Sequence, residues 1–224
     1  MRSTFTIPAF APLALCAAIA AATSMGACAA NSSAKDTLAF DSSSGTAGSV
    51  SVFGSTVNYT AYTVTYVSKP IDAAQEVMTV YIPSTATKDS AIYMPLNTGG
   101  YMQLDSLAPA DVTTSNNTDQ PHAAAVALSK GMVVASVSGR GRNTTMVING
   151  VTTEVGNGPS AIVDLKAAIR YLKHNDKTML GDADKIIISG TSGGGAFSSL
   201  IGTTGNSAIY QKYLTQIGAA DEKD

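Results

Sequence analysis

A serine set among glycines is the residue of this chain best suited to covalent chemistry. Gly190, Ser192 and Gly194 match the pattern G-x-S-x-G, and they follow the apolar, β-branched residues 186–188 directly. Where a strand turns sharply into a helix, a serine at the turn is held in a strained conformation that exposes its hydroxyl. Side chains two residues to either side would collide there, and glycine at both positions removes the collision. The spacing therefore predicts that Ser192 is a nucleophile.

Attack by a serine on a carbonyl group requires N–H donors that stabilise the negatively charged oxygen of the tetrahedral intermediate. Each preorganised donor contributes about 3–4 kcal/mol. The amide of Gly193, at the start of the predicted helix, is one candidate, and the second should come from the loop after an earlier strand. Gly99 and Gly100 occupy that place, although an ordinary Gly-Gly turn is the alternative. Tyr101, the next residue, is a candidate substrate contact.

Two arginines in the segment Arg140-Gly141-Arg142 follow another predicted strand. Arg140 and Arg142 are candidates to contact an acidic group of a substrate. A structural salt bridge is the more common fate of such a residue, and this alternative stays open for both.

The elements that would position these residues change character along the chain. Residues 62–67 and 77–82 alternate as half-buried strands do and are joined by a hairpin-like connection, so the domain begins with antiparallel strands. From residue 91 onward, strand-like segments alternate with helical ones, which predicts a parallel sheet with right-handed crossovers. The predicted strands are residues 91–96, 132–137 and 186–188, and the predicted helices lie near residues 124–128, 159–173 and 210–217. The fold class is therefore α/β, with a mostly parallel sheet and helices on both faces.

The helix that begins near Pro159 has the clearest pattern. Its apolar stripe consists of Ile162, Leu165, Ile169 and Leu172. Four charged residues lie off this stripe, namely Asp164, Lys166, Arg170 and Lys173. Asp164, near the N-terminus of the helix, has the charge that the helix dipole favours there.

Together these features resemble the α/β-hydrolase superfamily, and their residue patterns are most similar to those of bacterial tannase-like and related esterases. The resemblance covers residues 59–221 and rests on the antiparallel strands, Gly99-Gly100, Arg140-Gly141-Arg142, the helix A-I-V-D-L-K-A-A-I-R-Y-L and the serine turn. It implies hydrolysis of small-molecule carboxylic esters through an acyl-serine intermediate, without a cofactor. In tannases the substrates are gallate and related phenolic esters.

The superfamily places an acid and then a histidine after the serine, and this chain departs from that order. Both histidines, His122 and His174, precede Ser192. His174 ends the long helix, and a surface position is expected. His122 precedes the helix after the Gly-Gly loop, near the predicted site, where a surface or substrate-contacting role is favoured over that of the catalytic base. The acids after the serine are Asp221, Glu222 and Asp224, too close to the end of the sequence to be credible partners.

Residues 186–188 would form a long apolar edge if no strand paired with them. We therefore expect this chain to be the N-terminal part of a hydrolase domain, without its C-terminal strands and inactive by itself. A missing C-terminal segment is the expected partner.

The first 28 residues have the features of a signal peptide. Arg2 precedes the apolar residues 9–23, which are too few to span a bilayer comfortably. Met25-Gly26-Ala27-Cys28 resembles a bacterial lipobox, with methionine where leucine is usual, so we expect export and lipidation at Cys28. Ordinary secretory cleavage is the alternative. The membrane is expected to be involved only through this possible anchor.

The expected organisation is a signal peptide over residues 1–28, a tether with a first short strand over residues 29–56, and the hydrolase domain over residues 57–224. Serine, glycine and alanine dominate the tether. Cys16 lies in the segment to be removed and Cys28 is the only other cysteine, so the mature domain contains no disulfide.

Composition excludes several classes of function. A net charge of −2 over 224 residues gives no reason to expect a nucleic-acid partner. No cluster of residues has metal-ligand spacing. Residues 156–161 match G-x-G-x-x-A, a dinucleotide fingerprint, but the next strand ends in Ser189-Gly190 and not in the acidic residue that such a site needs.

The favoured function is therefore a serine esterase in which Ser192 attacks a carboxylic ester. Two alternatives remain. One is a non-catalytic envelope protein that uses a hydrolase-like scaffold for binding, and the other is a serine peptidase of the same fold.

Overall fold

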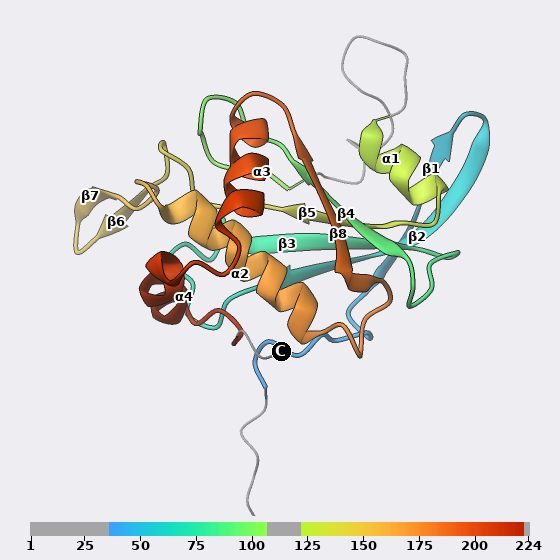
Figure 1. Cartoon of the computed structure of the whole chain (residues 1–224), viewed down its shortest axis with the longest axis horizontal. Coiled ribbons are helices and arrows are strands. Elements are labelled where there is room, and N and C mark those ends of the chain that lie inside the picture. The colour runs from blue at the N-terminus through green and yellow to red at the C-terminus, as the bar shows by residue number, and fades with distance from the viewer. Residues whose placement is uncertain (1–35, 107–121, 222–224) are drawn as a thin grey trace, which may run out of the picture. The chain divides into compact units, whose positions relative to one another are not determined.

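Six strands form the central sheet of the part of the chain that the computed structural model describes, residues 36–106 and 122–221 (Figure 1). Across the sheet their order is β1 (Thr46–Val52), β2 (Ser55–Thr65), β3 (Val77–Pro83), β5 (Val133–Val137), β4 (Ala91–Leu96) and β8 (Asp182–Gly190). The predicted signal peptide, the predicted lipidation site Cys28, and the acids Glu222 and Asp224 lie outside the described residues.

The sheet is mixed. Antiparallel pairing joins β1 to β2, β2 to β3 and β3 to β5, whereas β4 runs parallel to both β5 and β8. The α/β class and the antiparallel N-terminal strands are confirmed, but the parallel part contains only β5, β4 and β8. Strand β8 forms one edge, and no other strand of the described residues pairs with its outer side.

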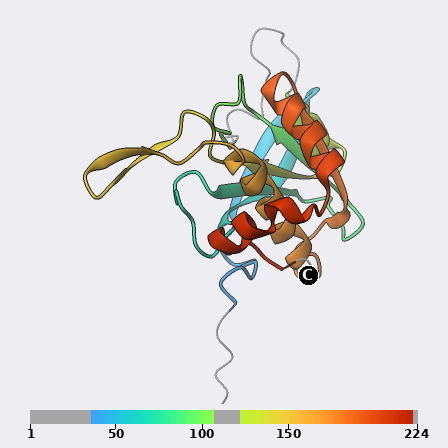
Figure 2. The same ribbon diagram turned by 60° about the vertical axis from the view of Figure 1, so that its left-hand side comes forward.

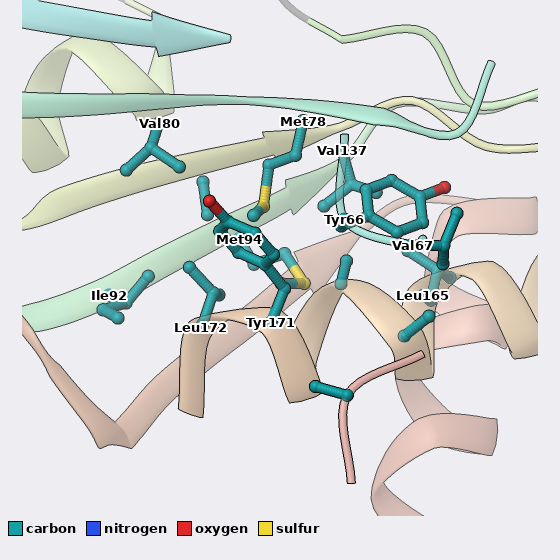
Figure 3. Packing of buried hydrophobic residues seen from close by; sticks show 14 of the residues in the cluster. Tyr66, Val67, Met78, Val80, Ile92, Met94, Val137, Leu165, Tyr171 and Leu172 are labelled. Atoms are coloured by element: carbon teal, nitrogen blue, oxygen red, sulfur yellow. The ribbon is translucent and has the colours of Figure 1, made fainter. Parts of the chain in front are cut away.

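Helices cover both faces of the sheet, as the sequence predicts. They are α1 (Ala123–Ser129), α2 (Ser160–His174), α3 (Gly193–Thr204) and α4 (Gln211–Ile217), with a short 3-10 turn, η2 (Ala208–Tyr210), before α4. On one face, Met78 and Met94 pack against Leu165 and Leu172 of α2 (Figure 3). A second cluster gathers around α1, whose buried residues include Leu128. None of the described helices has the length and apolar character needed to cross a membrane.

Helix α2 is buried on more sides than its apolar stripe indicates. Asp164 is fully buried, and Lys166 and Arg170 are nearly so. The sheet covers one side of the helix, while α3 and α4 contact another. Each charge therefore has a local partner: Lys166 donates to the carbonyl of Gly205, and Arg170 donates to the Gln211 side chain over 3.0 Å. Three of the four charged residues off the stripe thus lie inside the packed layers, and only Lys173 is exposed.

The packed domain begins earlier than the predicted tether allows. Leu38 is buried, and the N–H of Phe40 donates to Oδ1 of Asn175 over 2.7 Å. The same asparagine donates from Nδ2 to the carbonyl of Leu38 over 2.9 Å. Two apolar residues in a serine- and glycine-rich segment are therefore sufficient to dock it at the C-terminal end of α2, because a buried amide side chain satisfies its backbone groups.

A two-stranded hairpin projects from the domain beside α2, and the sequence analysis did not predict it (Figure 2). It consists of β6 (Thr145–Ile148) and β7 (Val151–Glu154). Asn149 and Gly150 connect the strands with φ angles of 52° and 79°, as a type I′ turn requires. The Asn-Gly pair between apolar residues is the sequence signal that could have identified the hairpin.

Candidate active site

The turn between β8 and α3 has the geometry that a serine nucleophile needs. Ser192 has φ 55° and ψ −119°, a conformation that costs a non-glycine residue about 1–3 kcal/mol, and its side chain is exposed. A Cβ atom on Gly190 would lie 2.5 Å from the carbonyl carbon of Gly194, and one on Gly194 would lie 2.5 Å from the carbonyl oxygen of Leu96. Both flanking glycines are therefore sterically required, as their spacing predicts.

The Gly-Gly loop, residues 97–103, lies at the same end of the sheet as this turn, where the parallel strands β4 and β8 finish. Parallel strands bring their carboxyl ends together, and Leu96 of β4 pairs with Gly190 of β8. Gly100 and Tyr101 both have positive φ, 58° and 61°, so the loop folds back tightly. The hydroxyl of Thr98 donates to the carbonyl of Met102 over 2.7 Å and closes it.

The Gly-Gly loop packs directly against the start of α3. A Cβ atom on Gly193 would lie 2.9 Å from the amide nitrogen of Tyr101 and 3.2 Å from that of Gly100. Among the carbonyl groups of the described residues, none accepts a hydrogen bond from the N–H of Gly100, Tyr101 or Gly193. The structure therefore brings together three unengaged N–H groups from the two segments that the sequence analysis singled out.

Tyr101 lies at the rim of this arrangement. Its ring is half exposed and meets the ring of Phe197 edge to face, with 5.4 Å between the centroids. Phe197 belongs to α3, so the aromatic pair spans from the Gly-Gly loop to the helix after the serine. The predicted contact residue is thus beside Ser192, on the solvent side of the loop.

The two arginines after β5 have different positions. Arg140 is buried, with Nε 3.0 Å and Nη2 2.6 Å from the two carboxylate oxygens of Asp164. This supports the salt-bridge alternative and leaves its guanidinium unavailable to a substrate. Arg142 is exposed, and its Nη2 lies 3.7 Å from the position of a Cβ atom on Gly100. The arginine beside the Gly-Gly loop is therefore Arg142.

A second carboxylate shares the buried charge of Arg140. Oε1 of Glu76 lies 3.6 Å from Nη2 of Arg140, and the Glu76 side chain is fully buried. Burial raises the pKa of Glu76 to about 7, and the nearby charge of Asp164 adds to the effect. Burial also raises the pKa of Asp164, which the guanidinium of Arg140 opposes. Because Asp164 receives the stronger hydrogen bonds, Glu76 is the group of this cluster that takes up a proton near neutral pH.

His122 lies close to the serine turn, but its hydrogen bonding does not suit a base. It lines a pocket of about 300 Å³ with Asn97, Ser189 and Thr191. Its Nδ1 accepts a hydrogen bond from the N–H of Ala124 over 3.2 Å and caps α1. In the neutral ring the proton is then on Nε2. In this state the ring nitrogen that carries the lone pair already accepts a hydrogen bond, so His122 is not placed to take the proton of the Ser192 hydroxyl.

His174 and Asp221 do not reach the serine turn. His174 ends α2, and its Nε2 lies 2.6 Å from a carboxylate oxygen of Asp36. The C-terminus of α2 leads into the start of β8, whereas Ser192 follows the end of β8. The pair of His174 and Asp36 therefore lies at the opposite end of the strands from Ser192. Asp221 is exposed and borders a groove with Lys166 and Lys173. Residues 36–106 and 122–221 therefore contain no acid–histidine pair at the serine.

The glycine pattern of residues 156–161 has a packing explanation. A Cβ atom on Gly156 would lie 1.7 Å from the carbonyl oxygen of Gly141. This glycine thus permits two backbones to touch, which accounts for the pattern without a dinucleotide. In the described part of the chain, no group of three histidine, cysteine, aspartate or glutamate residues is arranged to hold a metal ion.

The sheet topology, the strained serine turn and the adjacent Gly-Gly loop define an α/β-hydrolase-like protein. The chain belongs to the BD-FAE family, whose model matches residues 78–223. A comparison with curated protein sequences found no match.

Several solved tannase structures match most of this chain. The tannase of Fusobacterium nucleatum has 38% identity and a TM-score of 0.76 over 82% of this chain and 39% of its own. The tannase of Lactobacillus plantarum has 37% identity and a TM-score of 0.71 over 82% and 40%. A tannin acyl hydrolase in complex with ethyl gallate has 38% identity and a TM-score of 0.71 over 82% and 41%. The chain therefore spans about two fifths of the length of these relatives, which indicate an esterase-type hydrolase.

Proposed function

We propose that the protein is a serine esterase with Ser192 as its nucleophile. The observation that carries the proposal is the position of an exposed, strained serine beside the three unengaged N–H groups of Gly100, Tyr101 and Gly193. The Ser192 hydroxyl oxygen attacks the ester carbonyl carbon and loses its proton to a base. The N–H of Gly193, with one or both from the Gly-Gly loop, stabilises the oxyanion. The alcohol leaves with the proton, and water then releases the acid.

The proposed substrates are phenolic esters of the tannin type. One of the similar structures is a tannin acyl hydrolase with bound ethyl gallate. In this chain the half-exposed ring of Tyr101 lies against Phe197 of α3, and the exposed guanidinium of Arg142 lies beside Gly100; both groups suit a phenolic ring. Tyr101 is therefore proposed as a substrate contact, and Arg140 is not.

The base and acid of the triad are proposed to come from outside the described residues. His122 and His174 are engaged in capping α1 and in the pair with Asp36, as described above. The outer side of β8, where Ile187 is half exposed, is the proposed place for a further strand. Without the base, about 10³–10⁴-fold catalysis over water remains, so residues 1–224 alone should be almost inactive.

Export, with a lipid anchor at Cys28, completes the proposal. It is supported by the apolar N-terminal segment and by the residues before Cys28. Mass spectrometry of the mature N-terminus tests it, since an acylated cysteine supports the anchor and an unmodified residue after Ala29 contradicts it.

The test of the esterase proposal is hydrolysis of p-nitrophenyl and gallate esters by the full-length protein. Ser192→Ala should abolish the activity, while Ser199→Ala, an exposed serine of α3, should leave it unchanged. Equal rates for the wild type and Ser192→Ala would contradict the proposal. Faster cleavage of peptide than of ester substrates would instead identify a serine peptidase.

A further inference from the structure

The segment after β5 is anchored to α2 by the buried pair of Arg140 and Asp164. Besides the two side-chain hydrogen bonds, the backbone N–H of Arg140 donates to Oδ2 of Asp164 over 2.8 Å. A planar guanidinium held at two points has one orientation relative to its carboxylate. Three hydrogen bonds to one carboxylate therefore fix both the side chain and the backbone of Arg140 relative to α2.

The residues around Arg140 hold the Gly-Gly loop. Hydrogen bonds join this segment to the end of the Gly-Gly loop and to Leu104, which follows it: Leu104 N–H to Gly139 O (2.9 Å), Gly139 N–H to Leu104 O (3.0 Å), Arg142 N–H to Tyr101 O (2.9 Å) and Gln103 N–H to Asn143 Oδ1 (2.7 Å). The bond to Tyr101 is the most informative, because it fixes the peptide group that follows one of the unengaged N–H donors.

The two segments are also in van der Waals contact, with no space between their backbones. A Cβ atom on Gly141 would lie 2.0 Å from the carbonyl carbon of Met102 and 2.1 Å from the nitrogen of Gln103. A displacement of Arg140 must therefore move residues 101–104. The amide nitrogen of Tyr101 is in contact with Gly193, so the movement reaches the serine turn.

We infer that Arg140 and Asp164 are positioning residues for the oxyanion hole, because they fix the segment that holds the Gly-Gly loop against Gly193. The inference rests on the proposed esterase function. Neither side chain touches the substrate, since both are buried. Their effect is on the placement of N–H donors, and small errors in the placement of groups that stabilise a transition state are costly.

Kinetics of the full-length protein test the catalytic part of the inference. Asp164→Asn should lower kcat at least tenfold and change KM less than twofold, because the donors act on the transition state. Arg140→Lys keeps the positive charge but loses the two-point contact of the guanidinium with the Asp164 carboxylate. Its kcat should therefore fall less than that of Asp164→Asn. The matched control is Asp184→Asn, which breaks an exposed pair between β8 and Lys173 of α2 and should leave kcat unchanged.

Rates are expressed per active site, with the number of active sites titrated by a fluorophosphonate. This distinguishes a lower kcat caused by misplaced donors from a smaller amount of folded protein. If Asp164→Asn and Arg140→Lys lower only the number of titrated sites and leave kcat per site at the wild-type value, the inference is overturned. If Asp164→Asn does not fold, Arg140→Lys decides the question by the same criterion.

Hydrogen exchange provides a test that needs no activity. In the full-length protein, the hydrogen-bonded amides of Met102, Gln103 and Leu104 should exchange at least tenfold faster in Asp164→Asn or Arg140→Lys than in the wild type, and Asp184→Asn should not differ. Unchanged exchange in both variants contradicts the inference. If the wild type shows no Ser192-dependent hydrolysis, the esterase proposal fails, while the exchange rates still decide whether this pair holds the loop.

Discussion

Gly193 and Tyr101 are in backbone contact: a Cβ atom on Gly193 would lie 2.9 Å from the amide nitrogen of Tyr101. This contact joins the serine turn to the Gly-Gly loop, although the two residues are far apart in the sequence. It brings backbone N–H groups of both segments close together next to Ser192.

Replacement of Gly193 by alanine should therefore reduce catalysis without unfolding the protein. The added methyl group must displace the Tyr101 amide, so we expect kcat of the full-length protein to fall tenfold or more with little change in KM. Gly202→Ala is the matched control, because Gly202 belongs to the same helix and a Cβ atom on it would meet nothing within 4 Å. An unchanged kcat for Gly193→Ala would show that the contact does not set the donor geometry.

Ser192→Gly should make the protein more stable while it abolishes activity. Ser192 holds φ 55° and ψ −119°, and glycine adopts positive φ without a steric penalty. After the entropic cost of glycine in the unfolded chain, about 1 kcal/mol of net stabilisation is expected. Chemical denaturation of the wild type, Ser192→Gly and Ser192→Ala measures it. Ser192→Ala keeps the strain, so equal free energies of unfolding for the two variants would contradict a strained turn.

The buried carboxylate of Glu76 should make stability depend on pH near neutrality. Its pKa is about 7 in the folded protein, above the ordinary 4.5, so its contribution is complete below pH 4.5 and is lost as the pH rises through 7. The loss is on the order of 3 kcal/mol, from about 1.4 kcal/mol per pKa unit. Glu76→Gln mimics the protonated form. The free energy of unfolding of the wild type, relative to this variant, should be lower at pH 8 than at pH 5, and the same difference at both pH values would be inconsistent with ionisation of Glu76.

Two neighbouring glycines should differ sharply in their tolerance of alanine. Gly156→Ala places a methyl group 1.7 Å from the carbonyl oxygen of Gly141, whereas a Cβ atom on Gly158 meets nothing within 4 Å. Overpacking of this kind costs about 1–3 kcal/mol. Thermal unfolding should show a clear loss for Gly156→Ala and almost none for Gly158→Ala. Equal melting temperatures would mean that the two backbones can separate at little cost.

The local signals in the sequence were sufficient for the serine turn and for the alternation of strands and helices from β4 onward, except for the hairpin of β6 and β7. Gly190 and Gly194 were identified correctly because their role depends on atoms within a few residues, and the strand–helix alternation is a local pattern. A salt bridge was the more common fate expected of Arg140, but its partner Asp164 was not predicted, since helical periodicity places Asp164 on a face that is usually exposed to solvent. Here the segment that follows β5 packs against Asp164, and this contact depends on the assembled fold.

The segment before β1 was missed for a related reason. Leu38 and Phe40 are isolated apolar residues among serine and glycine, and they pack against the core, Leu38 buried and Phe40 partly buried, where Asn175 accepts from the Phe40 N–H and donates to the Leu38 carbonyl. Such long-range side-chain contacts leave no periodic trace in the sequence.

The most direct test of the central claim is the site of covalent labelling by a fluorophosphonate in the full-length protein. Mass spectrometry of proteolytic peptides should find one adduct, on Ser192, and Ser192→Ala should remove it while Ser199→Ala retains it. Only an activated serine beside donors for the phosphonyl oxygen reacts readily. If the wild type is not labelled, or if the adduct persists in Ser192→Ala, the chain does not contain a nucleophilic serine at this turn, and a binding protein on a hydrolase scaffold becomes the better account.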